Sequence, residues 1–151
     1  NQYYSNENGL NSRIDEIQCS ILNYKLKKVD YFIKQRKKLV NIYLNELKNT
    51  DLKLPYEEVK NKHVYHLFTV FHPKGRKISK LLKKFKIETR AIYPYPIHKM
   101  KAYKGLIKNK NRLTNSEKLS KGIFCLPLYP ELSVNEVKFI CKKLRLILKK
   151  I

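Results

Sequence analysis

The sequence predicts an α+β fold in which a small antiparallel sheet packs on helices and a long helix comes first. Apolar residues recur at steps of three and four over residues 14–47 and 137–148, which is the spacing of amphipathic helices. Runs rich in β-branched and aromatic residues lie between them, at 63–72, 87–92 and 123–126, and such runs are typical of strands. With 151 residues and no internal repeat, the chain is expected to form one domain with its own core.

The first helical region begins with polar residues that can cap a helix. Ser12, with Asp15 three residues later, is a reasonable start, and Asn11 just before it is an alternative. The apolar pattern that follows is long for a globular helix. We therefore expect a break near residues 28–30, with Asp30 able to cap the second part.

The middle of the chain is predicted to form a strand, a helix and a second strand. Residues 63–72 predict the first strand, and a short amphipathic helix is expected over 78–85. Residues 87–92 predict a second strand. Pro94 and Pro96 should end its ladder, because proline has no N–H group to donate.

The last third contains two candidate capping boxes. Thr114 with Glu117 predicts a short helix, and Ser133 with Glu136 predicts the start of the final helix. Between them, residues 123–126 predict a third short strand, ended by a proline.

The charge balance is strongly basic. Lys and Arg total 34 against 12 Asp and Glu, which gives a formal net charge of +22. Such a charge could indicate a basic module that binds nucleic acid or an acidic partner. The lysines are spread along every segment, however, so we interpret the charge as a compositional bias and do not expect a nucleic-acid site. No apolar run approaches the roughly 18 to 20 residues that cross a bilayer, and the N-terminus lacks a signal-peptide pattern.

The cysteines and histidines do not predict a metal site. Cys19, Cys125 and Cys141 are odd in number and widely spaced, which argues against a disulfide framework and favours a reducing, cytoplasmic setting. His63 and His66 lie three apart on an expected strand, so their side chains would point to opposite faces. We therefore predict no metal ligands.

Three short motifs carry the strongest functional signal. They are residues 9–18 (GLNSRIDEIQ), residues 93–98 (YPYPIH) and residues 126–132 (LPLYPEL). In order and spacing they resemble the small C-terminal domain of DegT/StrS-type sugar aminotransferases. The resemblance covers nearly the whole chain, from residue 2 to the last helix. Enzymes of this family use pyridoxal 5'-phosphate (PLP) to place an amine on a keto-sugar carried by a nucleotide.

This resemblance implies both what the chain contains and what it lacks. Residues 1–151 would form the C-terminal small domain of an aspartate-aminotransferase-type fold. The larger N-terminal domain, with the lysine that holds PLP, would be absent, so no catalytic residue is expected here. The family also implies a homodimer, glutamate as amino donor, and a nucleotide-sugar substrate used for surface polysaccharides or glycosides. Ile92 and Met100 stand where the family often has histidine and glutamine, which leaves the sugar open.

Asn11 and Arg13 are the candidate cofactor ligands. On residue type alone they are a helix cap and a surface charge, or else an anion site, because a helix start offers free N–H groups. The resemblance implies that Asn11 reaches across the dimer interface to the cofactor phosphate of the other subunit. It implies a phosphate contact or a bracing role for Arg13.

Tyr4 and His98 are the candidate substrate contacts. Tyr3 and Tyr4 could simply anchor a loop, and a lone histidine such as His98 could be a structural group. The prolines before His98 restrict its backbone, however, which suits a binding pocket. The resemblance implies that Tyr4 lies close to the neighbouring active site. It also implies that His98 lines the sugar side of the pocket, where we expect it to position the substrate rather than transfer protons.

Overall fold

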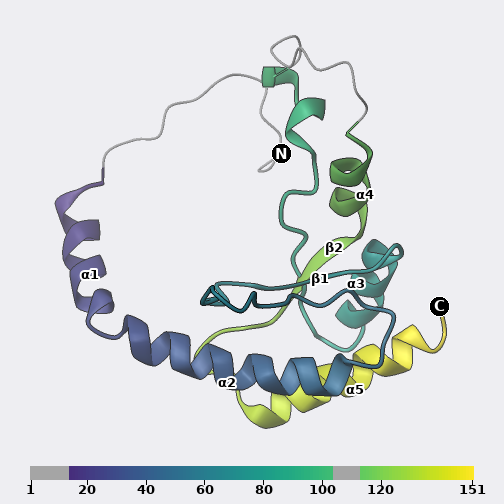
Figure 1. The fold of residues 1–151 in the computed structure, drawn as a ribbon, viewed down its shortest axis with the longest axis horizontal. Coiled ribbons are helices and arrows are strands. Elements are labelled where there is room, and N and C mark those ends of the chain that lie inside the picture. Colours follow the sequence, from purple (N-terminus) through teal and green to yellow (C-terminus); the bar gives the residue numbers. More distant parts are fainter. Residues whose placement is uncertain (1–13, 104–112) are drawn as a thin grey trace.

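The computed structural model describes residues 14–103 and 113–151, and it confirms the predicted α+β class (Figure 1). Among the described residues, no helix combines the length and apolar character needed to cross a bilayer. The elements follow one another in this order: α1 (Glu16–Leu26), α2 (Val29–Leu47), β1 (Phe68–Phe71), α3 (Gly75–Lys83), the 3-10 helices η1 (Ile97–Lys99) and η2 (Lys101–Tyr103), α4 (Thr114–Gly122), β2 (Ile123–Leu126) and α5 (Val134–Leu148).

The long helical region breaks where the sequence predicted, between α1 and α2. Asp15 is the N-cap of α1, and its carboxylate accepts a hydrogen bond from the backbone N–H of Gln18 at 2.7 Å. α1 therefore begins later than at Ser12 or Asn11, the two expected starts, which themselves lie outside the described residues. The expected capping role of Asp30 is wrong: Lys28 is the N-cap of α2 and makes no side-chain cap, while Asp30 lies in the first turn.

β1 and β2 form an antiparallel pair in which Phe68 lies opposite Leu126. The strand expected over 123–126 is confirmed, whereas the one expected over 63–72 forms only at its C-terminal half, as β1. The reason is local. Tyr65 has a φ of 47°, in the left-handed region, and its N–H donates to the ring Nδ1 of His63 instead of to a neighbouring strand.

The strand predicted over 87–92 is wrong. In this segment Arg90 makes a single antiparallel bridge to Cys125 of β2, with N···O distances of 3.3 and 2.9 Å. Tyr93 then turns the chain with a φ of 54°. Because this turn and the prolines follow directly, the ladder does not extend.

The two capping boxes have different outcomes. At the start of α5 the box is complete, since the Ser133 hydroxyl accepts from the N–H of Glu136 and the Glu136 carboxylate accepts from the N–H of Ser133. At α4 the expected box is wrong, because Thr114 is already the first helical residue and the N-cap before it makes no side-chain hydrogen bond. The Glu117 carboxylate bonds to a different segment.

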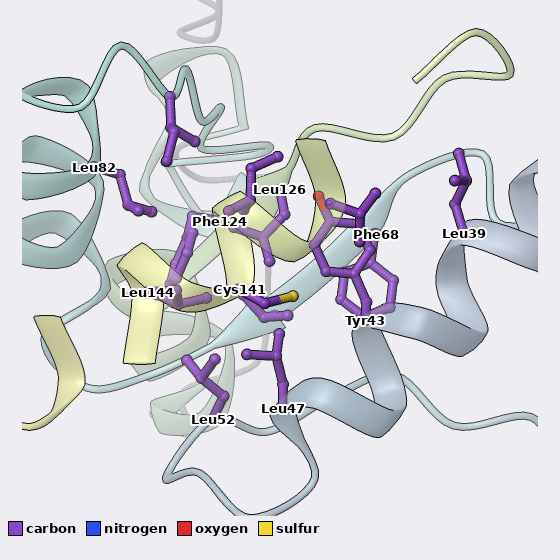
Figure 2. Packing of buried hydrophobic residues seen from close by; sticks show 14 of the residues in the cluster. Leu39, Tyr43, Leu47, Leu52, Phe68, Leu82, Phe124, Leu126, Cys141 and Leu144 are labelled. Carbon is purple, nitrogen blue, oxygen red and sulfur yellow. The ribbon is translucent and has the colours of Figure 1, made fainter. Parts of the chain in front are cut away.

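The core lies between α2, α5, α3 and the sheet (Figure 2). The ring of Tyr43 stacks on Phe68 with centroids 4.7 Å apart, and its hydroxyl donates to the carbonyl of Pro127 at 2.9 Å. Cys125 and Cys141 are buried, as expected for small core residues. The two-stranded sheet is therefore held on one side by the packed pair α2 and α5.

α1 is the exception to this packing. It buries no residue, and Figure 1 shows it extending from the end of α2 away from the sheet. Its apolar side chains are exposed, from 51% at Ile21 to 75% at Ile17. An apolar helix in this condition is expected to have a partner that covers it.

Candidate functional site

His98 is the predicted site residue that the structure describes. Tyr4, Asn11 and Arg13 lie outside the described residues, so their roles stay predictions.

His98 lies in a short 3-10 turn, because the strand predicted over residues 87–92 does not form before it. Pro96 is the N-cap of η1, with the extended backbone (φ −65°, ψ 141°) that proline favours. The turn closes when the N–H of Met100 donates to the carbonyl of Ile97 at 3.0 Å. The prolines still fix the backbone direction at His98, by starting this turn.

The His98 ring bonds across the fold to α4. Its Nε2 lies 3.2 Å from Oε1 of Glu117, and the two side chains are only 14% and 16% exposed. Lys99 Nζ lies 3.4 Å from the same oxygen, but the Lys99 side chain is 58% exposed. The shielded His98–Glu117 pair therefore fixes the ring more firmly than the exposed lysine can.

His98 lines a pocket of about 500 Å³ between the 92–98 segment and α4. Its lining is mostly apolar, with a few polar groups: the His98 ring, the Tyr93 phenol and the hydroxyls of Ser116 and Ser120. An apolar pocket with few directed polar groups is the usual form of a small-ligand site. The complete lining is Ile92, Tyr93, Pro96, Ile97, His98, Leu113, Ser116, Leu119, Ser120 and Ile123.

A second groove lies where α1 meets α2 and the loop before α5. Leu22, Leu26, Val29 and Phe32 give it an apolar floor. Arg36 also lines it, and among the described side chains its Nε is a buried donor with no hydrogen-bond partner. A buried donor of this kind favours a covering surface that brings an acceptor.

The described lysines do not fit the covalent PLP position. A Schiff-base lysine is activated by burial or by a neighbouring cation. None of the lysines in the described residues is buried, and Lys37 and Lys143 alone among them are even half-buried. Lys37 pairs with Glu57 at 3.3 Å, and Lys143 lies over the rings of Phe85 and Phe139. These two amines are therefore occupied by surface contacts.

Glu117 is the site residue that sequence reasoning missed. The pattern of Thr114 followed by Glu117 suggested a local capping role, and nothing in the local sequence points to His98, which is 19 residues away. Ser120, one turn later, donates its hydroxyl to the backbone carbonyl of Glu117 at 3.0 Å. Only the tertiary fold brings Glu117 to the ring of His98, behind the pocket that His98 and Ser120 line.

Together, the helices, the two-stranded sheet and the shielded histidine define a small α+β domain with a mostly apolar pocket between a proline-rich turn and a helix. The model of the DegT/DnrJ/EryC1/StrS aminotransferase family matches residues 1–145. The chain therefore belongs to this family.

Relatives and solved structures agree with this assignment. The chain is 32% identical to the pleiotropic regulatory protein of Geobacillus stearothermophilus, over 95% of this chain and 39% of the relative. It is 33% identical to a dTDP-3-amino-3,4,6-trideoxy-alpha-D-glucose transaminase of Micromonospora megalomicea, over 86% of this chain and 36% of the relative. The structure of S. venezuelae DesV, in complex with a ketimine intermediate, superposes with a TM-score of 0.85 at 27% identity, over 100% of this chain and 41% of DesV. This chain thus spans about two fifths of the length of these proteins.

Proposed function

We propose that this chain is the C-terminal small domain of a PLP-dependent aminotransferase that aminates a nucleotide-linked keto-sugar. The family match over residues 1–145 carries the proposal. The share of the relatives that the chain spans supports the view that a larger domain, with the PLP lysine, belongs to the same enzyme. The exposure of the described lysines agrees with a lysine supplied from elsewhere.

In this proposal the domain binds and orients, while the chemistry is supplied by the bound cofactor, which acts as an electron sink. His98 lines the sugar side of the pocket and positions the substrate. Tyr4 contacts the substrate from the N-terminal segment. Asn11, supported by Arg13, binds the cofactor phosphate in the neighbouring subunit.

The proposed partners are a second subunit, a nucleotide-sugar and glutamate as amino donor. The exposed apolar face of α1 and the groove with the unpaired Arg36 donor support an extensive contact with another part of the assembly. The basic surface would raise the local concentration of an anionic nucleotide-sugar. Three free cysteines support a reducing compartment, and we place the enzyme in the cytoplasm.

The proposal is tested by sequencing the full open reading frame that contains these residues and expressing its product. We expect a longer polypeptide that, with PLP, shows a visible aldimine band which borohydride fixes onto a lysine outside residues 1–151. With glutamate it should aminate at least one member of a panel of dTDP- and UDP-linked keto-sugars. A borohydride-fixed lysine within residues 1–151, or a polypeptide inactive on the whole panel, would contradict it.

A further inference from the structure

The pair His98 and Glu117 joins the two walls of the pocket. His98 comes from η1 and Glu117 from the first turns of α4, and their side chains meet at 3.2 Å with little exposure. We propose that Glu117 is a positioning residue: it holds the Nε2 edge of His98 so that Nδ1 is presented to the sugar as a hydrogen-bond acceptor. This inference rests on the proposed function, because it assigns the orientation of the proposed sugar contact.

The chemistry of the pair determines which nitrogen is left for a ligand. A neutral imidazole has one N–H donor and one acceptor nitrogen, and an ionised carboxylate can only accept. With Glu117 at Nε2, the ring proton is held on Nε2 and the lone pair is on Nδ1. His98 lines the pocket whereas Glu117 does not, so the carboxylate acts from behind the ring.

Both partners are held by their own elements, so the orientation does not depend on the ligand. Pro96 starts the turn that carries His98. Glu117 is on a helix that runs directly into β2 of the sheet, and its carbonyl accepts from the Ser120 hydroxyl. A ring fixed from behind in this way loses little freedom when a ligand binds.

The arrangement selects for a chemical class of substrate group. An acceptor nitrogen in a mostly apolar pocket favours a sugar hydroxyl or amine that can donate a hydrogen bond to it. A sugar that lacks this group would leave Nδ1 without a partner and would bind less tightly. The pair thus sets specificity at one position of the sugar ring.

The first test follows the ring proton in this chain. The chain has four histidines, and the signal of His98 is assigned by its loss in His98→Gln. At about pH 9, above the usual histidine range, nitrogen-15 spectra should show a slowly exchanging Nε2–H for His98. Glu117→Ala should lose this signal, and Glu117→Gln should keep it in part, because the amide oxygen still accepts. An unchanged signal in Glu117→Ala would overturn the proposal.

The second test uses the polypeptide of the full reading frame and the most active sugar of the panel. Glu117→Ala should raise KM for the sugar about tenfold, the effect of one directed hydrogen bond, with kcat and KM for glutamate little changed. His98→Ala should act similarly, and the double variant should be no worse than either alone. Glu46→Ala, which breaks an ion pair with Arg145 elsewhere, is the matched control with an unchanged KM.

The outcomes separate the two proposals. An enzyme that is active on the sugar but whose KM is unaffected by Glu117→Ala, or whose two variants add independently, contradicts the positioning role alone. A full-frame polypeptide with no activity on any sugar of the panel contradicts the proposed function, while the ring-proton signal still reports whether Glu117 holds His98.

Discussion

Gly75, the first residue of α3, lies in direct backbone contact with Gly122, the last residue of α4. A methyl group at Gly75 would overlap the carbonyl oxygen of Gly122, and one at Gly122 would overlap the carbonyl of His72 and the ring of Phe71. The same carbonyl of Gly122 accepts from the N–H of His72 at 3.2 Å. This contact fixes the junction of α4 and β2, and through α4 it helps to fix Glu117.

Gly75→Ala should therefore destabilise the domain strongly. The new methyl group meets backbone, which cannot move aside as a flexible side chain could, and overpacking of this kind costs about 3 kcal/mol. Urea unfolding followed by circular dichroism measures the loss. Lys77→Ala, at an exposed position of the same helix, is the matched control and should change the free energy of unfolding by less than about 0.5 kcal/mol.

Tyr43→Phe should cost about 1 kcal/mol, because it removes the hydrogen bond from the hydroxyl to the Pro127 carbonyl but keeps the ring stacked on Phe68. Burial raises the pKa of the Tyr43 hydroxyl, so the group stays protonated and able to donate. Tyr31→Phe, on an exposed tyrosine, is the control with little effect. Equal stability of the two variants in urea unfolding would show that the buried hydrogen bond contributes nothing.

Local signals in the sequence predicted the elements whose ends are set by neighbouring residues. The box of Ser133 and Glu136 is closed within one turn, so α5 begins where expected. The strand predicted over residues 123–126 is also confirmed, as β2. In both cases a residue next to the element marks its limit: Ser133 caps the start of α5, and Pro127 follows the last residue of β2.

The predictions are wrong where a residue distant in sequence, or an unusual backbone angle, determines the local structure. Glu117 looked like a cap but bonds to His98, and this competition is invisible without the fold. The strand over 63–72 is shortened by the left-handed Tyr65, although tyrosine itself favours strands. For the candidate site, the 93–98 motif contains His98, which lines the described pocket, but its role toward a sugar stays a prediction. Glu117, which contacts the His98 ring, could not be found from the motif.

Cys141 should make stability fall at alkaline pH. Burial, followed by the charge of Glu46, raises its pKa from 9.0 to about 12. The unfolded thiol therefore ionises from about pH 9, while the native thiol stays protonated and binds more protons than the unfolded one. The stability from this group is complete below pH 9 and is lost as pH rises toward 12.

The free energy of unfolding, measured in urea between about pH 8 and 11, tests this sign. The free energy of unfolding should fall less steeply with pH for Cys141→Ala than for the unsubstituted chain. The two slopes should differ by up to about 1.4 kcal/mol per pH unit. Leu144→Ala is the control, since it also opens a cavity on α5 but keeps the thiol, and its slope should match the unsubstituted chain. Identical slopes for Cys141→Ala and Leu144→Ala would contradict the prediction.

The apolar face of α1 should drive association without contributing to the stability of the isolated domain. Ile17 and Ile21 are 75% and 51% exposed, so the double replacement by serine removes much less buried apolar area than a replacement in the core would. The free energy of unfolding should therefore change by less than about 1 kcal/mol.

Sedimentation should show that the unsubstituted chain associates at high concentration and that the double variant stays monomeric, because the apolar area is available to a partner. Leu146→Ser, at a 45% exposed position on α5, is the control and should leave association unchanged. If the double variant associates as strongly as the unsubstituted chain, the contact surface lies elsewhere, and the groove with Arg36 would be the next surface to test.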